Sequence, residues 1–387
     1  ASGSFSTRVS DLVTDSGSFS TRVSDSNLYL SGSGTIISGS STSTGSFGHI
    51  TLSEGLEIGG VFKASLSNND LGANNTIFGK SAGDVIASGG DKNALFGENA
   101  GTALTTGDQN VAIGYNALLT EDAASSTVAI GALALETQNA GSGDAYNTAV
   151  GRKSGYAVST GTKNTLVGGL SGVAIADGED NVAIGYQALD ANVSGDLNVA
   201  IGVSALGAFI GSAAVAVGRE ALRNLNHASQ ADGTVGIGQG AGANLTNGQY
   251  NTAIGYQALA TTTFGDKNVA VGYQAGKAYV PTENYGNSVF IGHQAGLNVT
   301  TARKATVIGN AAVGSGVMTG NQNTVIGNEA GYALVAGQQN TLMGVGTADA
   351  MTGGSYNVAI GVDAIGVSTD VDLSVAIGHS AMGGGNV

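Results

Sequence analysis

The chain has no cysteine, no tryptophan, a single proline and few charged residues, and each shortage excludes a class of protein. Without cysteine there is no disulfide framework, no thiolate metal site and no cysteine nucleophile. One proline among 387 residues, with no glycine at every third position, excludes collagen. Charged residues make up 11% of the chain, well under the usual share of about 25%. This profile argues against an ordinary enzyme.

The charge balance and the hydrophobic pattern exclude two kinds of partner. The chain has 14 Lys and Arg against 28 Asp and Glu, so its net charge is −14 and no basic face neutralises phosphates. We therefore expect no nucleic-acid partner. No apolar run approaches the roughly 18 residues of a membrane span, so we expect no membrane insertion. Because 42% of the residues are apolar, we expect most of the chain to be folded.

Glycine is abundant, with 65 residues, and it marks an internal repeat. A glycine that closes an apolar tripeptide such as Val-Ala-Ile recurs eighteen times, and eleven of the seventeen intervals are 17 residues. We call it the motif glycine and count positions within each repeat from it. The motif glycines are Gly79, Gly97, Gly114, Gly131, Gly151, Gly168, Gly185, Gly202, Gly218, Gly238, Gly255, Gly272, Gly292, Gly309, Gly327, Gly344, Gly361 and Gly378.

Each repeat predicts a short strand and a tight corner. Large residues, mostly Val or Thr and then Ile or Val, stand three and one positions before the motif glycine, so their side chains share one face of an extended chain. We expect that face to fill the core, and the residue between them, often Ala, to face a neighbouring chain. Asn precedes the motif glycine by four in twelve repeats, and we expect it to adopt the positive φ of a corner. This predicted turn ladder includes Asn110, Asn181, Asn198, Asn251 and Asn268.

The repeat predicts an all-β fold over residues 75–387, a parallel β-solenoid of about 18 rungs of about 17 residues. Rungs that pair at about 4.8 Å would give a stiff rod of roughly 85 Å. One rung has only two large apolar side chains, a thin core for a free-standing solenoid. We therefore predict that the chain forms a homotrimer.

The first 74 residues follow a different pattern. Residues 2–11 recur letter for letter as residues 16–25, an offset of two heptads, and apolar residues fall at the alternating spacings of a coiled-coil seam. We predict a short coiled-coil stalk over residues 1–27. Residues 28–74 are rich in Ser, Gly and Thr with short alternating apolar runs, which predicts a β-rich adaptor.

The repeat also carries a resemblance. Its core, Asn-Val-Ala-Ile-Gly-Tyr-x-Ala at residues 110–117 and 181–188, resembles the head repeats of trimeric autotransporter adhesins, which are left-handed β-rolls wound as trimers. Together with the Ser-Gly-Ser-Phe-Ser-Thr-Arg-Val units and residues 43–49, it resembles tail fibres and other virion fibres of tailed phages. The rungs are longer than those of adhesin heads, and no anchor segment follows Val387, which favours the phage fibre. Neither family supplies catalytic residues.

One column of the repeat predicts a surface stripe. Tyr256, Tyr273 and His293 directly follow the motif glycine on three consecutive rungs, and each is followed by Gln. Aromatic faces stack on sugars and Gln can hydrogen-bond hydroxyls, so the stripe is a candidate glycan or receptor contact. The alternative, which we favour, is that these rings only cap a corner of the solenoid.

Insertions lengthen three rungs near residues 139–146, 226–233 and 279–286. Recognition tends to reside in such excursions from a rigid scaffold. The last insertion contains the single proline and two tyrosines, Tyr279 and Tyr285, which we include among the candidate receptor contacts.

No cluster predicts catalysis or metal binding. The four His residues lie far apart, and we expect the acidic residues of 177–180 and 370–372 to be solvated loop charge rather than a glycosidase pair. The Asp-containing corners do not match the calcium-binding β-roll repeat. We therefore expect no catalytic residue, no cofactor and no metal, and a protein that is not an enzyme.

These observations predict a structural fibre protein of a virion or the extracellular space. We expect a stiff trimeric spacer in a phage tail fibre, with host-surface attachment as a second role. Its partners would be its own copies, other fibre or virion proteins, and a host glycan or protein. The alternative is a bacterial trimeric adhesin head or an extracellular filament subunit. A third hypothesis is a tailspike-type polysaccharide depolymerase.

Overall fold

A computed structural model describes residues 56–58, 62–64, 72–226, 233–282 and 286–384. The chain divides into two compact units, residues 1–51 and 52–387, and the described residues belong to the second. The predicted coiled-coil stalk and most of the predicted adaptor lie outside the described residues. Within the adaptor, β1 (Leu56–Ile58) pairs antiparallel with β2 (Phe62–Ala64).

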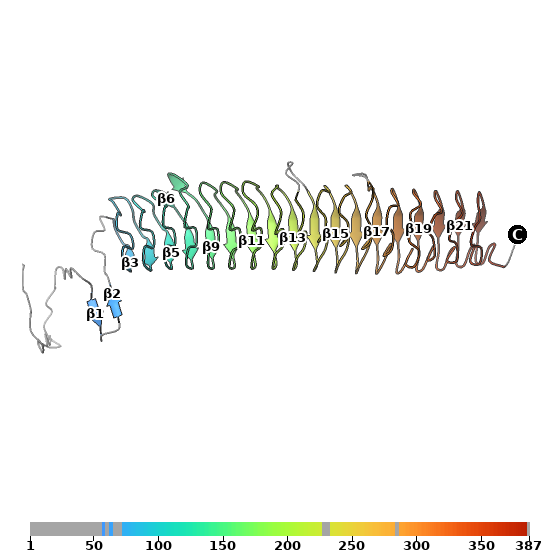
Figure 1. Ribbon diagram of the computed structural model, residues 1–387, viewed down its shortest axis with the longest axis horizontal. Coiled ribbons are helices and arrows are strands. Elements are labelled where there is room, and N and C mark those ends of the chain that lie inside the picture. Colours follow the sequence, from blue (N-terminus) through green and yellow to red (C-terminus); the bar gives the residue numbers. More distant parts are fainter. Residues whose placement is uncertain (1–55, 59–61, 65–71, 227–232, 283–285, 385–387) are drawn as a thin grey trace, which may run out of the picture. The chain divides into compact units, whose positions relative to one another are not determined.

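The described residues from 72 to 384 form a parallel β-solenoid, and the predicted fold class is confirmed (Figure 1). Each rung contributes one three-residue strand, which pairs in parallel and in register with the strands of the neighbouring rungs. In one example, Ala183 of β11 lies opposite Ala200 of β12. The described part of the chain contains no helix.

Eighteen strands make up this ladder. They are β3 (Thr76–Phe78), β4 (Ala94–Phe96), β5 (Val111–Ile113), β7 (Val128–Ile130), β9 (Thr148–Val150), β10 (Thr165–Val167), β11 (Val182–Ile184), β12 (Val199–Ile201), β13 (Val215–Val217), β14 (Val235–Ile237), β15 (Thr252–Ile254), β16 (Val269–Val271), β17 (Val289–Ile291), β18 (Thr306–Ile308), β19 (Thr324–Ile326), β20 (Thr341–Met343), β21 (Val358–Ile360) and β22 (Val375–Ile377). At the first insertion, β6 (Ala124–Ser125) and β8 (Gly143–Asp144) form a second, shorter parallel pair.

The strands face the opposite way from the sequence prediction. The middle residue points into the interior, where Ala183 and Ala200 are fully buried, whereas Ile184 and Ile201 remain 37% and 36% exposed. The predictions that the large flanking residues fill the core and that the alanines face another chain are both wrong. Where the middle residue of a strand is small, larger side chains from the opposite wall are buried instead, such as Leu189 and Leu206.

The opposite wall fills the interior from two positions, four and seven residues after the motif glycine. Where the fourth position is glycine, as at Gly172, a large residue at the seventh position, Ile175, is buried over it. A Cβ on Gly172 would lie 2.8 Å from Ile175 Cδ1, so Ile175 could not keep its present position beside a larger residue. Where the fourth position is large, as at Leu189, the seventh is often small or polar, as at Asn192. The two positions therefore share one volume of core.

The motif glycines are required by both conformation and space. Gly185 has φ +135°, a region that L side chains rarely adopt. A Cβ at this position would lie 2.6 Å from the carbonyl oxygen of Gly202 on the next rung. The glycine column therefore allows the rungs to approach at the spacing of a paired sheet.

The asparagines form a hydrogen-bonded ladder inside the solenoid. Asn181 Oδ1 accepts the backbone N–H of Asn198 at 3.0 Å, and Asn181 Nδ2 donates to the Gly195 carbonyl at 2.9 Å. The expectation that the asparagine itself adopts a positive φ is wrong, because the residue before it does so, as Leu197 does at φ 60°. The five asparagines predicted for the turn ladder are all fully buried: Asn110, Asn181, Asn198, Asn251 and Asn268.

A second polar ladder, at the position six residues before the motif glycine, was not predicted. Asp196 Oδ1 accepts the backbone N–H of Glu179 on the preceding rung at 2.8 Å, and Ser212 Oγ accepts the N–H of Asp196 at 2.9 Å. The same arrangement recurs at Asp108, which accepts from Asp91 at 2.6 Å. Acidic residues in this column therefore satisfy backbone donors at the corner.

Candidate functional site

The structure brings the predicted aromatic stripe together. The rings of Tyr256 and Tyr273 stack with centroids 5.4 Å apart and planes 10° apart, and Tyr273 stacks on His293 at 5.1 Å and 9°. The glutamines that follow form a parallel chain, in which Gln274 Nε2 donates to Gln257 Oε1 at 3.1 Å and Gln294 Nε2 donates to Gln274 Oε1 at 3.3 Å. The in-register sheet spacing produces both ladders, because equivalent residues lie one rung apart.

This geometry limits what the stripe can bind. The ring of Tyr273 is stacked on both faces, by Tyr256 and by His293, and each of these two rings has one face stacked on Tyr273, so these faces are not available to a sugar. Tyr256 and Tyr273 are 40% and 44% exposed. Stacked aromatic pairs contribute about 0.5–1.5 kcal/mol beyond their burial. The arrangement therefore favours the interpretation of the stripe as a stabilising ladder at the corner.

The tyrosines of the last insertion divide differently. Tyr279 is fully buried, its ring lies 5.1 Å from that of Phe290, and its hydroxyl lies 3.2 Å from Ser288 Oγ. Burial raises the pKa of Tyr279 to about 12. The prediction that Tyr279 contacts a receptor is therefore wrong, because the side chain belongs to the core. Tyr285 lies outside the described residues.

The carboxylates do not converge on a cleft. The members of the two acidic clusters, Asp177, Glu179, Asp180, Asp370 and Asp372, are exposed. Among the described residues, no group of His, Cys, Asp and Glu is placed to hold a metal ion. No helix in the described part of the chain is long and apolar enough to cross a membrane.

The sequence pattern did not indicate one buried carboxylate, Glu121. Glu121 is fully buried, and its two oxygens accept the N–H of Ala124 at 2.8 Å, the N–H of Ala140 at 3.1 Å and the side-chain amide of Gln138 at 3.0 Å. Glu121 stands seven residues after a motif glycine, where ten of the other rungs have an apolar residue. It supports the insertion between β6 and β8 and is enclosed by protein donors, so it has a structural role.

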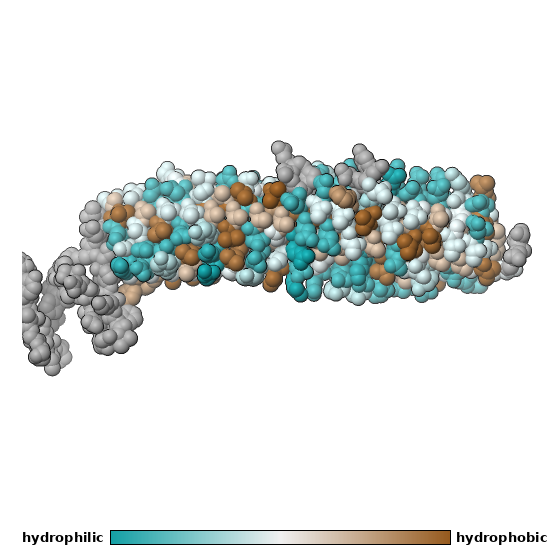
Figure 2. All heavy atoms as spheres, viewed as in Figure 1, coloured by the Kyte–Doolittle hydropathy of each residue, from teal (hydrophilic) through white to brown (hydrophobic). Residues whose placement is uncertain are grey.

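The outward strand face is the most extensive unusual surface. We define it as the residues three and one before each motif glycine, such as Val182 and Ile184. These side chains are apolar or Thr on all eighteen strands, and the residues just before the glycine stay between a third and two fifths exposed on seven strands: Phe96, Ile113, Ile184, Ile201, Ile237, Ile291 and Met343. Figure 2 shows separate apolar patches between hydrophilic atoms on the face in view. The alternating pattern alone could not reveal this face, because it does not say which side of the strand is inside.

Comparison of the chain with protein-family models and with curated protein sequences found no match.

Proposed function

We propose that this protein is a non-enzymatic structural fibre protein that acts as a stiff homotrimeric spacer, most consistent with a segment of a phage tail fibre in the virion. The observation that carries the proposal is the combination of an unbroken in-register ladder of eighteen strands with an outward strand face that stays apolar along its length. A spacer needs the first property, and side-by-side association of chains needs the second.

Stiffness follows from the bonds between rungs. Every strand of the ladder pairs with its neighbour at all three residues, as β20 does with β21. The buried asparagines add side-chain bonds between rungs, for example from Asn340 Nδ2 to Asn323 Oδ1 at 3.1 Å. Bending the solenoid would stretch buried hydrogen bonds on one side, and an unmade buried hydrogen bond costs about 1–3 kcal/mol.

The outward strand face supports association between copies. Eighteen strands about 4.8 Å apart and about 10 Å long present about 850 Å². A standard protein interface buries about 800 Å² on each partner, so the face has the size of a stable contact. A face of this extent that is lined by apolar residues and Thr is typical of interfaces. The resemblance to trimeric adhesin heads selects three copies rather than two, with the outward strand faces toward the common axis.

The second part of the proposal is that the fibre attaches to a host surface. Its partners would then be other virion proteins and a glycan or protein of the host. Surface exposure of both acidic clusters supports the spacer over the depolymerase, since a glycosidase needs two facing carboxylates. The bacterial adhesin head or filament subunit remains the alternative, because it would use the same architecture.

The test is the mass of the full chain in solution, measured by light scattering, with one variant and one control. We expect three times the chain mass of 37.8 kDa. Ile184→Lys places a charge on the outward strand face and should shift the mass toward the monomer. Val193→Lys is the control, because Val193 is 50% exposed on a loop rather than on that face. A monomeric wild-type chain, or equal behaviour of the two variants, would contradict the trimer.

A further inference from the structure

Two rows of exposed side chains flank the outward strand face. We call the residues five positions before each motif glycine the leading rim, and the residues directly after each motif glycine the trailing rim. Large apolar or aromatic side chains are exposed at five positions of the leading rim: Tyr146, Leu197, Tyr250, Tyr356 and Leu373. They are exposed at seven positions of the trailing rim: Tyr115, Tyr186, Val203, Tyr256, Tyr273, Val345 and Val362.

The exposed apolar surface is concentrated on this side of the solenoid. Of the 28 large apolar or aromatic side chains that are exposed among the described residues, 21 belong to the outward strand face or to one of its rims. The other seven are Val85, Val193, Ile210, Phe264, Val317, Tyr332 and Val367. Single exposed apolar residues are normal on a protein surface, whereas their accumulation on one side marks an interaction surface. That surface therefore includes the rims as well as the strand face.

Association of copies would bring unlike rims together. When copies surround an axis parallel to the solenoid, with their outward strand faces toward it, the leading rim of one copy meets the trailing rim of the next. If the copies are parallel and in register, the two residues that meet belong to the same repeat and stand six positions apart in the sequence. The sequence of one chain then shows, rung by rung, whether the rims match.

The exposed apolar residues of the two rims fall on the same repeats. Three of the five on the leading rim have an exposed large partner six residues later: Leu197 with Val203, Tyr250 with Tyr256, and Tyr356 with Val362. Leu197 is 61% exposed and Val203 is 44% exposed, so both would withdraw apolar surface from water on contact. An aromatic pair such as Tyr250 with Tyr256 adds about 0.5–1.5 kcal/mol beyond its burial.

The charges agree with the same register. With the copies in register, no rung sets two charges of the same sign on the rims that meet. Lys92 on the leading rim meets Glu98 on the trailing rim. Glu98 would then lie between Lys92 of the neighbouring copy and Lys80 of its own chain, whose Nζ is 3.7 Å from Glu98 Oε1. Complementary charges of this kind fix the register of an interface.

A shift of one rung weakens the match in either direction. In one direction Leu197 faces Arg219, and only Tyr250 keeps an exposed large apolar or aromatic partner. In the other direction three apolar pairs remain, but two rungs set cation against cation: Lys92 with Lys80 and Lys163 with Arg152. Like charges placed opposite each other in an interface cost stability.

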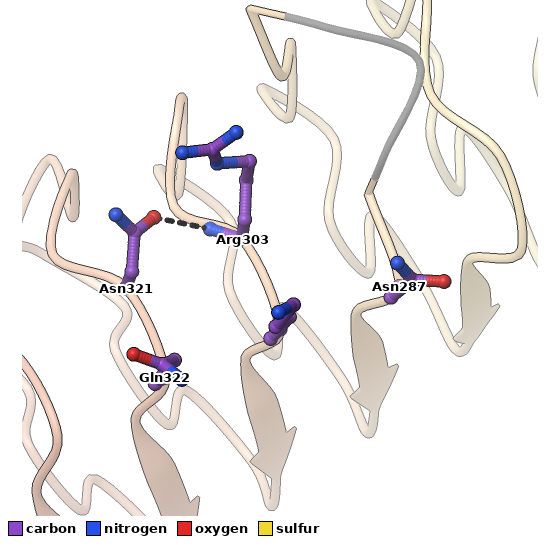
Figure 3. Close-up of a pocket in the computed structure, with 5 residues that line it drawn as sticks. Asn287, Arg303, Asn321 and Gln322 are labelled. Atoms are coloured by element: carbon purple, nitrogen blue, oxygen red, sulfur yellow. Dashed lines mark hydrogen bonds between the residues drawn. The ribbon is translucent and has the colours of Figure 1, made fainter.

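Polar residues match where the leading rim is hollowed. A groove of about 400 Å³ lies at the corner that leads into strands β17, β18 and β19 (Figure 3). Three of its five lining residues belong to the leading rim: Asn287, Lys304 and Gln322. The trailing-rim residues of the same three repeats are also polar: His293, Asn310 and Asn328. Amide and imidazole groups both donate and accept hydrogen bonds, so the two rows are compatible across such a seam.

We propose that neighbouring copies of this chain pack parallel and in register, with the leading rim of one copy against the trailing rim of the next, and that the rim pairs of each repeat fix this register. The inference rests on the proposed association of the chain with its own copies. It adds the direction of the copies, their register and the residues that meet, and it holds for any number of copies around the axis.

The experiment is disulfide cross-linking of the full chain, which has no cysteine of its own. Leu197→Cys combined with Val203→Cys places one thiol on each rim of one repeat. The two cannot join within a chain, because the strand between them spans about 10 Å and a disulfide needs Cα atoms within about 7 Å. We expect mild oxidation to give bands at two and three times the chain mass on a non-reducing gel.

Matched controls test register and direction. Leu197→Cys combined with Tyr186→Cys or with Arg219→Cys places the second thiol one rung away in either direction, and we expect little cross-linking. Leu197→Cys alone should also stay uncross-linked, since an antiparallel pair of copies would bring the leading rim against itself. Tyr356→Cys combined with Val362→Cys repeats the test on a distant rung and should cross-link.

Light scattering of each variant before oxidation separates this inference from the proposed function. Multimers that cross-link through a shifted pair or through Leu197→Cys alone would overturn the register or the direction and leave the association intact. Multimers that cross-link through neither same-repeat pair would overturn the rim contact. A monomeric wild-type chain would contradict the proposed association itself.

Discussion

Removing one asparagine from the interior ladder should open the solenoid locally. In Asn181→Ala, the backbone N–H of Asn198 loses its acceptor at 3.0 Å and the carbonyl of Gly195 loses its donor at 2.9 Å. Both groups lie where the side chains are fully buried, so water cannot replace the lost partners without opening the rung. Each stranded group costs about 1–3 kcal/mol, which gives a loss of about 2–6 kcal/mol for the variant.

The assay must be local, because long repeat arrays need not unfold as one cooperative unit. Hydrogen exchange read by mass spectrometry reports the free energy of opening segment by segment. We expect peptides that cover residues 181–202 to lose protection by about a thousandfold, which corresponds to about 4 kcal/mol. Peptides that cover β20 and β21, many rungs away, should change much less.

The control is Asn310→Ala. Asn310 also donates from its side-chain amide to an asparagine on the next rung, Asn328, at 2.9 Å, but at an exposed position. We expect a change within about 0.5 kcal/mol, as for most surface substitutions. If Asn181→Ala and Asn310→Ala lowered protection equally, burial of the ladder would not be what stabilises the rungs, and the reasoning would be refuted.

Two further predictions follow from the glycine column and the buried tyrosine. Gly185→Ala should destabilise its rungs by about 3 kcal/mol or more, measured by hydrogen exchange, because the residue has φ +135° and its Cβ would lie 2.6 Å from the Gly202 oxygen. The control Gly169→Ala should be nearly neutral, because its Cβ would meet nothing closer than 3.6 Å. A larger loss of stability in Gly169→Ala than in Gly185→Ala would contradict the account. Because burial raises the pKa of Tyr279 to about 12, the folded state holds this proton more tightly than the unfolded state, so stability should fall as pH rises from about 10 toward 12. Denaturant titrations at several pH values should show a smaller alkaline loss for Tyr279→Phe, and identical pH profiles would show that Tyr279 is not buried in its neutral form.

The regularity of the sequence was enough to predict the architecture but not its two faces. The motif glycines gave the rung length and the position of each strand, because only glycine fits φ near +130° beside the next backbone. The alternation of large and small residues at Val182, Ala183 and Ile184 showed that each strand has two different faces. Which face lies inside was then predicted from the general rule that larger apolar residues are buried. That rule failed because the interior is filled from the opposite wall.

A finer pattern in the repeat carried the missing information. Positions four and seven after the motif glycine compensate for each other, as Gly172 with Ile175 and Leu189 with Asn192 show. When one of the two positions is small where the other is large, the two side chains fill the same part of the core. This pattern indicates that the wall carrying both positions faces the interior, and that the flanking strand residues face outward. The second polar ladder, at the position six residues before the motif glycine, was harder to predict, because Asp at a corner is equally consistent with solvated charge.

The candidate site was only partly predictable for a similar reason. Tyr256, Tyr273 and His293 share the position directly after the motif glycine, and in-register rungs stack equivalent positions, so the sequence predicted that they lie together. Tyr279 was assigned to an excursion because the insertion was predicted near residues 279–286, yet it occupies the seventh position after the motif glycine, which is a core position of its rung. The insertion starts after it.

Electron microscopy of the purified full chain tests the central claim most directly. The account predicts straight rods with a solenoid segment of about 85 Å and, in end-on class averages, three equivalent lobes around one axis. Compact particles, freely bent filaments, or rods with the cross-section of a single chain would contradict it.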